Sequence, residues 1–541
     1  MARLFMTLLR LGAAALALAA FAIASTATAA PALPPGARPN DIDVLAARVQ
    51  KTFDVPGLSV AIVQDGKTLF AKGYGVREAG KPDPVDADTL FGIGSNTKAF
   101  TTAALAMLVD EGKLHWDDKV IDLMPQVRLY DPYVTRELTV RDILTHRSGL
   151  GLGSGDLMLF PPSDFTRAEI IHNLRVFRPA SSFRSRFAYD NLLYILAGEL
   201  VPTLTGVSWE DFVQTRILDR LKTGCAATVG MIKTPDVAQP HVPVDGRLIH
   251  VVQDRSTAYD PAGSIQCSAN GMAAWVKLQL ADGRLPDGQP LFSAAQHAEM
   301  WTPQTILTPL PDTAPLTGTH FRDYGLGWFL DDYHGSLRVG HTGGLVGMVT
   351  YVSLVPDKKL GIVVLTNQQS GGAMSAMMMS LLDAFLAAPS KARPSQDWVA
   401  WWKAKTDQQD KRADEADRAA EAAIKAAGGR PFLPLDAYVG VYHDPWRGDA
   451  EVRRVGDKLR LKFSRTQDMQ GDMQVMKGNV FVVRWDDRTL KADALVNFQT
   501  GMDGAVSGMT MKPLSPTTDF SFDFQDLDFT RLATAAPAPR K

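Results

Sequence analysis

The stretch FGIGSNTK, residues 91–98, places a serine hydroxyl and a lysine amine three positions apart. An apolar run follows it at helical spacing: Phe100, Ala103, Ala104, Met107 and Leu108. Positions i and i+3 share one face of a helix, so we expect Ser95 and Lys98 to lie close enough to share a proton. Serine is a weak nucleophile until a base takes its proton. The alternative is a serine that caps the helix beside a solvated lysine.

The length and net charge of the chain indicate how many domains it has and which partners it lacks. At 541 residues it is long enough for two or three domains. The formal net charge of −2 gives no basic excess, so we expect no nucleic-acid partner.

Residues 1–30 have the pattern of a secretory signal peptide. Arg3 and Arg10 give a positive start, residues 11–24 are apolar, and small residues offer a cleavage site near Ala29 or Ala30. An uncleaved anchor is the alternative, but the apolar run is short for a membrane span. We therefore expect a secreted or periplasmic protein with no stable membrane anchor after cleavage.

Strand and helix patterns predict one mixed domain over residues 31–389. Residues 58–63 and 68–76 alternate as a hairpin around Asp65-Gly66, and further strands are expected between 324 and 366. Helical segments fill the sequence between them. The predicted fold class is α/β (α+β), with a sheet that joins both ends of the domain and a helical insertion in the middle.

The rest of the chain changes character after that domain. Residues 390–430 are rich in alanine and charged residues and predict a helical linker whose tryptophans pack on a neighbour. Residues 431–531 alternate apolar and polar side chains between glycine turns, which predicts a small antiparallel β-barrel. Residues 532–541 are expected to form a flexible tail.

Two further motifs carry chemistry. Tyr189-Asp190-Asn191 precedes an apolar helix, and His341-Thr342-Gly343-Gly344 ends a predicted strand. Each alone would more often be a helix cap or an ordinary histidine. Lys222-Thr223-Gly224 competes with the second motif, but its position after a helix makes Gly224 a C-cap.

Taken in order, Ser95-x-x-Lys98, Tyr189-x-Asn191 and His341-Thr342-Gly343 resemble the β-lactamase-related serine hydrolases. That superfamily includes class C β-lactamases, D-alanyl-D-alanine carboxypeptidases, D-aminopeptidases and esterases. The flanking segments 144–150 and 324–328 agree with it. The resemblance covers about residues 40–390 and implies a β-lactamase/transpeptidase-like domain, with a mostly antiparallel sheet flanked by helices plus a helical subdomain. The region after 431 resembles the lipocalin-like barrel appended to some relatives.

The resemblance also implies roles for the motif residues. Ser95 would be the acylated nucleophile, Lys98 its proton partner and Tyr189 the general base or acid beside them. Asn191 would bind substrate and Lys98, with His341, Thr342 and Gly343 lining the substrate. The amides of Ser95 and Gly344 would form the oxyanion hole. A neutral lysine at pH 7 requires roughly 4–5 kcal/mol of differential stabilisation, so the choice of base between Lys98 and Tyr189 stays open.

Two departures from the family pattern bear on the substrate. Asp190 stands where a serine is common, which adds a negative charge near the site. His341 stands where many relatives have lysine, so the positive charge that would pair with a substrate carboxylate becomes pH-dependent. Both weaken an assignment as a β-lactamase, leave acyl transfer intact and give a peptidase or an esterase at least equal support.

Other chemistries lack support in the sequence. There is no zinc-protease His-Glu-x-x-His, no phosphate loop and no Gly-x-Ser-x-Gly elbow, so we expect no metal and no organic cofactor. Cys225 and Cys267 form either one disulfide or two buried thiols.

The sequence therefore predicts an exported serine hydrolase that cleaves an amide, β-lactam or ester bond of a small-molecule or peptide substrate. The alternative is a penicillin-binding-type sensor that is acylated without turnover or only holds a ligand. Either can assemble as a homo-oligomer.

Overall fold

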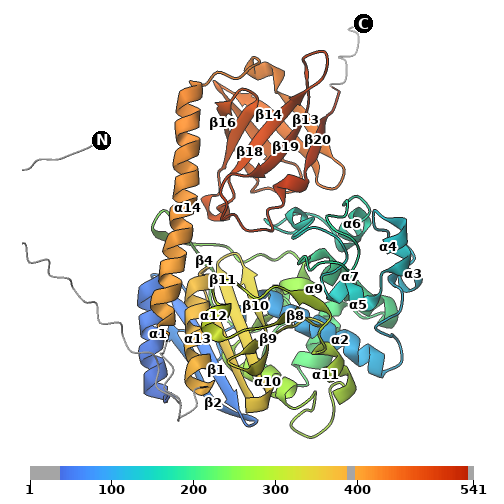
Figure 1. Ribbon diagram of the computed structural model, residues 1–541, viewed down its shortest axis with the longest axis vertical. Helices are drawn as coiled ribbons and strands as arrows, with labels where there is room; N and C mark the ends of the chain where they lie inside the picture. The colour runs from blue at the N-terminus through green and yellow to red at the C-terminus, as the bar shows by residue number, and fades with distance from the viewer. Residues whose placement is uncertain (1–36, 387–395, 534–541) are drawn as a thin grey trace, which may run out of the picture.

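The computed structural model describes residues 37–386 and 396–533. Residues 37–386 form a domain built on one eight-stranded sheet, here called the sheet domain (Figure 1). The strand order is β2-β1-β12-β11-β10-β9-β8-β7, and every neighbouring pair is antiparallel. The strands of this sheet are β1 (Gly57–Gln64), β2 (Lys67–Gly75), β7 (Thr305–Leu307), β8 (Arg322–Tyr324), β9 (Phe329–Tyr333), β10 (Ser336–Leu345), β11 (Met348–Val355) and β12 (Leu360–Thr366). The strand β1 from the start of the domain thus pairs with β12 from its end, which confirms the predicted fold class.

Alternate residues of the central strands pack into two different cores. On β1, Val60 and Ile62 belong to one apolar cluster, and Ala61 and Val63 belong to the other. The first cluster is covered by α1 (Pro39–Phe53) and α13 (Gly371–Leu386), the second by α2 (Thr97–Asp110) and α10 (Ala269–Leu280). A strand buried on both faces needs such a continuous apolar run, and the result is a helix–sheet–helix sandwich.

The predicted helical insertion lies between β2 and β7. Its other helices are α3 (Val120–Leu123), α4 (Pro132–Glu137), α5 (Val140–Leu144), α6 (Arg167–Asn173), α7 (Leu192–Thr205), α8 (Trp209–Val213), α9 (Asp260–Gly263) and α11 (Ala294–Met300), and α12 (Ala314–Thr317) follows β7. Short strand pairs β3 (Phe91–Gly92) with β6 (Gln266–Cys267), and β4 (His241–Val244) with β5 (Arg247–His250), complete it.

Two predicted elements differ from the structure. The pattern of residues 324–329 predicts one strand, but residues 325–328 form the turn between β8 and β9, because Gly327 has φ +83° and a side chain there would lie 2.8 Å from Thr102 Oγ1 of α2. The amphipathic pattern of residues 209–221 predicts one helix, but the structure has α8 followed by one π-helical turn, Gln214–Leu218.

A long helix and a closed barrel follow the sheet domain (Figure 1). The helix α14 (Trp398–Ala427) is tied to the sheet domain by Trp398 Nε1, which donates to Asp383 Oδ2 at 2.6 Å, and to the barrel by Arg484, which pairs with Asp417 at 2.6 Å. The barrel strands are β13 (Gly440–Asp444), β14 (Gly448–Val455), β15 (Lys458–Phe463), β16 (Gln470–Lys477), β17 (Val480–Trp485), β18 (Ala494–Thr500), β19 (Val506–Pro513) and β20 (Asp528–Arg531). The alternation of Phe520, Phe522 and Phe524 predicts a barrel strand, which is wrong, because residues 520–523 lie in a loop and Phe524 begins the 3₁₀ turn η8 (Phe524–Asp526).

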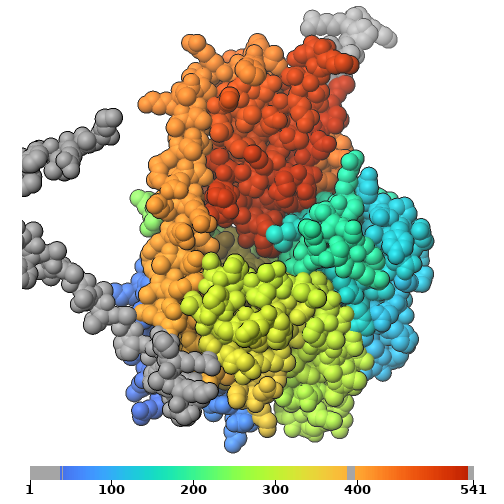
Figure 2. Space-filling view, in the orientation of Figure 1, coloured from blue at the N-terminus to red at the C-terminus, as the bar shows by residue number. Residues whose placement is uncertain are grey.

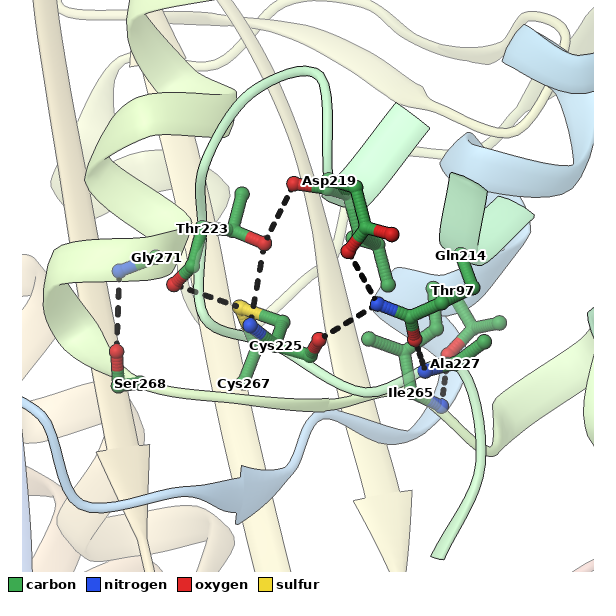
Figure 3. Close-up of a disulfide and its surroundings, with 11 residues drawn as sticks. Thr97, Gln214, Asp219, Thr223, Cys225, Ala227, Ile265, Cys267, Ser268 and Gly271 are labelled. Carbon is green, nitrogen blue, oxygen red and sulfur yellow. Dashed lines mark hydrogen bonds between the residues drawn. A yellow bond between two sulfur atoms is a disulfide. The ribbon is translucent and has the colours of Figure 1, made fainter. Parts of the chain in front are cut away.

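One disulfide joins Cys225 to Cys267 (Figure 3). The segment that contains Cys267 is fixed on both sides, since the Ile265 amide donates to Thr97 Oγ1 at 3.2 Å and Ser268 caps α10. Thr97 is the first residue of α2. The disulfide therefore fastens the strand that lies beside the start of α2, and the open choice between a bridge and two thiols is settled as a bridge.

No single helix in the described residues is long and apolar enough to cross a membrane, although α7 and the helix that follows it pass that test as a pair bent by 82°. The predicted signal peptide and most of the predicted tail lie outside the described residues.

Candidate active site

Ser95 and Lys98 lie where the sheet meets α2. The strand β3 leads into η1 (Gly94–Asn96), a single 3₁₀ turn, and α2 begins at Thr97. Lys98 is completely buried, whereas Ser95 is half-buried and lines a cavity. Neither η1 nor α2 has a side-chain cap. The interpretation as a capping serine beside a solvated lysine is therefore wrong.

The Lys98 amine contacts three oxygens. Its Nζ lies 3.1 Å from Ser95 Oγ, and it donates to Asn191 Oδ1 at 2.7 Å and to the Ala262 carbonyl at 2.9 Å. A neutral amine keeps two protons and one lone pair. Asn191 Oδ1 and the Ala262 carbonyl can only accept, so they take those two protons. The lone pair then faces Ser95 Oγ, where a base is needed.

Burial favours the neutral form of the Lys98 amine. It lowers the pKa of Lys98 from 10.5 to about 7, and the carboxyls of Asp156 and Asp190 oppose the shift. An ordinary lysine would hold its proton at neutral pH. Desolvation of the charged form is thus the main reason why Lys98 can act as a base here.

Tyr189 places a neutral phenol hydroxyl near Ser95. Its hydroxyl oxygen is buried and has no hydrogen-bond partner within the described residues. Its ring stacks on His146 at 4.3 Å, and Lys98 Nζ lies 4.8 Å from the ring centroid. Burial raises the pKa of Tyr189 well above its ordinary value, against the effect of the nearby Ser95 hydroxyl. Tyr189 is therefore a proton donor rather than a base at neutral pH.

Asp190, which the sequence predicts to add a negative charge near the site, does not line the cavity. Its side chain is buried, and its Oδ1 accepts the amide proton of Leu193 in the first turn of α7. Burial raises the pKa of Asp190 to about 7. The residue caps a helix, and its charge acts on Lys98 and on Asp156.

His341 does not supply a pH-dependent charge near neutrality. It lies inside β10, where its Nδ1 contacts the Thr342 carbonyl at 2.6 Å and its Nε2 contacts the Tyr324 hydroxyl at 3.1 Å. Burial and the Lys98 charge lower the pKa of His341 to about 3. The imidazole therefore stays neutral, with Nδ1 donating and Nε2 accepting, and serves as a wall of the site.

The strand β10 lies against the Ser95 turn at backbone distance. A side chain on Gly343 would come within 1.9 Å of the Ile93 carbonyl oxygen. Gly94 has φ +53°, and a side chain there would lie 2.7 Å from the Gly344 amide nitrogen. Glycine at these positions is what lets the backbones beside Ser95 and Gly344 face each other, which is the arrangement that an oxyanion hole needs.

The motif residues share one cavity of about 1570 Å³. Its lining includes Ser95, Tyr189, Asn191, His341, Thr342, Gly343 and Gly344. The sheet domain, α14 and the barrel all contribute to its walls. The structure thus brings together all the predicted site residues, with Lys98 buried directly beneath Ser95.

Arg322 of β8 is a cation on the cavity wall that the sequence reasoning missed. Its guanidinium lies 4.9 Å from the Phe329 ring, whose centroid is 5.0 Å from that of His341. The neighbouring Asp331 is occupied by two contacts from Arg338. Across residues 37–386 and 396–533, Arg322 takes part in no side-chain hydrogen bond or ion pair, so its charge is available to a ligand.

Two more contributors had little or no signal in the sequence. His146 stood inside a segment that matched the family but had no assigned role. Asp156 accepts the Asn191 amide at 2.9 Å, and only the structure reveals this contact.

Comparisons with known proteins agree with this geometry. A family model described as Beta-lactamase matches residues 45–384. The chain belongs to the beta-lactamase family. A second model, described as a domain of unknown function (DUF3471), matches residues 425–531, which contain the barrel. Members of the beta-lactamase family are serine hydrolases and penicillin-binding proteins, which cleave or bind amide and β-lactam groups.

Two similar curated proteins carry different kinds of name, one as a hydrolase and one as a penicillin-binding protein. The unguisins hydrolase ungD' of Aspergillus campestris is 29% identical over 491 residues, covering 85% of this chain and 87% of its own. Penicillin-binding protein 4 of Amycolatopsis lactamdurans is 28% identical over 352 residues, covering 62% of this chain and 88% of its own.

Solved structures share the fold. An octameric penicillin-binding protein homologue from Pyrococcus abyssi has a TM-score of 0.56 at 21% identity and covers 91% of this chain and 99% of its own. A class C beta lactamase from Rhodobacter sphaeroides has a TM-score of 0.53 at 22% identity and covers 64% of this chain and 99% of its own.

Proposed function

We propose that this protein is a serine hydrolase that forms an acyl-enzyme on Ser95 and cleaves an amide bond of a peptide substrate. One observation carries the proposal: a buried lysine amine, with a pKa of about 7, is aimed at an accessible serine hydroxyl by two fixed acceptors. A nucleophile within hydrogen-bond reach of a base that a third group orients is the signature of covalent catalysis.

The proposed reaction runs through Ser95, Lys98, Tyr189 and two backbone amides. Neutral Lys98 takes the Ser95 proton as Oγ attacks the carbonyl carbon. The Ser95 and Gly344 amides stabilise the oxyanion, for which one donor is typically worth roughly 3–4 kcal/mol. The Tyr189 hydroxyl gives its proton to the leaving nitrogen and recovers one from the Lys98 ammonium. Water then adds to the acyl-enzyme and releases the carboxylic acid and Ser95 in the reverse sequence of proton transfers.

The size of the cavity supports a peptide rather than a small lactam. At about 1570 Å³ it exceeds the roughly 300–1,000 Å³ of most small-ligand pockets. The relative named as an unguisins hydrolase covers 85% of this chain, which supports turnover over mere binding. The same site should also cleave esters, because an alkoxide leaves more easily than an amine and ester cleavage is therefore the easier reaction.

A hydrolysis panel tests the proposal. Nitrocefin, a p-nitrophenyl ester, and D- and L-amino-acid amides would be offered to the wild type and to Ser95→Ala. We expect amide and ester turnover by the wild type and none by Ser95→Ala. Acylation without turnover would indicate the penicillin-binding-type alternative, and equal turnover by both proteins would rule out Ser95 as the nucleophile.

We also propose export through a signal peptide cut near Ala29 or Ala30. The Cys225–Cys267 disulfide supports it, because disulfides persist in oxidising compartments. N-terminal sequencing of the protein recovered from the periplasm or medium tests the cleavage. A homo-oligomer stays a prediction for this chain, and light scattering during size exclusion tests it.

A further inference from the structure

One loop of the barrel contacts the sheet domain. Residues 514–527, between β19 and β20, pack on the segment 151–158 next to the active site. Figure 2 shows the barrel resting on this part of the sheet domain, with α14 along one side. A side chain on Gly153 would lie 2.7 Å from the Phe520 carbonyl oxygen, so the two backbones meet closely.

Asp523 anchors this loop in the sheet domain. Its carboxyl accepts the Gly155 amide at 2.6 Å and the Leu157 amide at 3.0 Å, and its side chain is completely buried. Two backbone donors converging on one buried carboxyl fix the segment that holds Asp156.

A second contact continues to the catalytic lysine. Ser521 Oγ donates to Asp156 Oδ2 at 3.0 Å, and Asn191 Nδ2 donates to the same oxygen at 2.9 Å. The other end of that amide, Asn191 Oδ1, accepts from Lys98 Nζ at 2.7 Å. An asparagine flipped end for end would aim its NH₂ group at the lysine, so the acceptor at Asp156 decides which end faces Lys98.

We propose that the β19–β20 loop is a working part of the active site, in which Ser521 and Asp523 hold Asp156, and Asp156 holds the Asn191 amide that aims Lys98 at Ser95. Asp156, Ser521 and Asp523 are positioning residues in this scheme. The inference rests on the proposed acylation of Ser95 and adds that the barrel sets its rate.

Phe520 extends the same contact to the other proton carrier. Its ring meets the Tyr189 ring edge-on at 5.9 Å and lines the cavity. The barrel loop therefore borders both Tyr189 and the Asn191–Lys98 pair, which are the two groups that move protons at Ser95.

Two serines provide a matched test. Ser521→Ala removes the bond to Asp156 at 3.0 Å, and Ser154→Ala removes another serine–aspartate bond across the same interface, to Asp526, also at 3.0 Å. Only the first leads to Lys98. The full-length proteins would be reacted with a fluorophosphonate probe at several concentrations, which separates the reversible binding constant from the maximal rate of Ser95 modification. Melting temperatures would be measured in parallel.

We expect Ser521→Ala to lower the maximal rate about ten-fold with unchanged reversible binding, since one hydrogen bond that orients the base is lost. Ser154→Ala should react like the wild type at a similar cost in melting temperature. Equal maximal rates for Ser521→Ala and the wild type would overturn the inference and leave the proposed function standing. A wild type that the probe does not modify at all would overturn both.

A conservative rescue separates positioning from folding. Burial, with Asp523 and Asp190 nearby, raises the pKa of Asp156 well above its ordinary value, so the neutral carboxyl is favoured. Asp156→Asn keeps an oxygen acceptor of the same shape, whereas Asp156→Ala does not. We expect Asp156→Asn to retain most of the maximal rate and Asp156→Ala to lose at least ten-fold. Equal losses, or no loss in either variant, would overturn the positioning role.

Discussion

Among single residues, burial decides which groups carry charge at the active site. Lys98 is pushed toward its neutral form, and His341, which occupies the position of a lysine in many relatives, is neutral as well. The motif identified these residues from the sequence, because spacing predicts which side chains share a helix face. It could not give their protonation states, because these depend on how deeply the folded protein buries each group.

The pH dependence of Ser95 modification follows from the pKa of Lys98. Below about pH 7 the amine is protonated and cannot accept the Ser95 proton, so the rate should rise with pH and level off above that value. Labelling rates measured between pH 5 and 10 with a probe that does not titrate give the midpoint of this rise. A midpoint near pH 10, the range of an ordinary lysine, would contradict the role of Lys98 as the base.

Arg322 predicts a preference for substrates with a carboxylate. Its guanidinium lines the cavity near His341 and, in the described part of the chain, makes no side-chain hydrogen bond or ion pair. Replacing Arg322 by Gln should raise KM for a peptide with a free carboxylate about ten-fold, the size of one charge-assisted hydrogen bond, and leave KM for a neutral ester unchanged. Steady-state kinetics on both substrates measure it, and equal shifts for the two would show that the change is not electrostatic.

At the scale of elements, the hairpin and the central strands could be predicted because their apolar periodicity is strong. Residues 58–63 and 68–76 were expected as strands, and the structure has β1 (Gly57–Gln64) and β2 (Lys67–Gly75). The turn at residues 325–328 could not be predicted in the same way. Gly327 is needed there because α2 approaches closely, and this contact between distant segments leaves no periodic pattern.

The docking of β10 against the Ser95 turn predicts a sharp intolerance at Gly343. An added methyl group would lie 1.9 Å from the Ile93 carbonyl oxygen, so Gly343→Ala must push the strand away from the nucleophile. We expect a loss of about a hundred-fold in the acylation rate, the usual effect of a displacement of about 1 Å.

Gly371→Ala is the matched control for this change. Gly371 also lines the cavity, but outside its chain neighbours and its own helical turn no atom of the described residues lies within 4 Å of the position that its new methyl group would take. It should therefore react like the wild type. An active Gly343→Ala protein would show that β10 does not set the geometry of the site.

At the scale of the whole molecule, segments far apart in the sequence meet at one site. Ser521 lies 365 residues from Asp156, and the alternating phenylalanines around it predict a strand where the structure has a loop. The sequence therefore predicts a barrel after the sheet domain but not where it docks. Docking depends on shape and on single polar contacts, which leave no local pattern.

Global stability should depend on the disulfide. It closes a loop of 42 residues, and such a bridge typically contributes about 2–4 kcal/mol to the free energy of unfolding. Denaturant unfolding of the wild type and of the double variant Cys225→Ser, Cys267→Ser measures the difference. Equal stability of the two proteins would show that the bridge does not limit the unfolded chain.

The mass of the intact protein during turnover shows whether Ser95 carries an acyl group. The wild type and Ser95→Ala would be mixed with an activated ester, quenched in acid within the first turnovers and digested to locate the modified peptide. The account predicts one acyl group per chain, carried by the peptide that contains Ser95, and none on Ser95→Ala. Ester hydrolysis by the wild type with no acyl adduct on that peptide, or an equal adduct on Ser95→Ala, would contradict it.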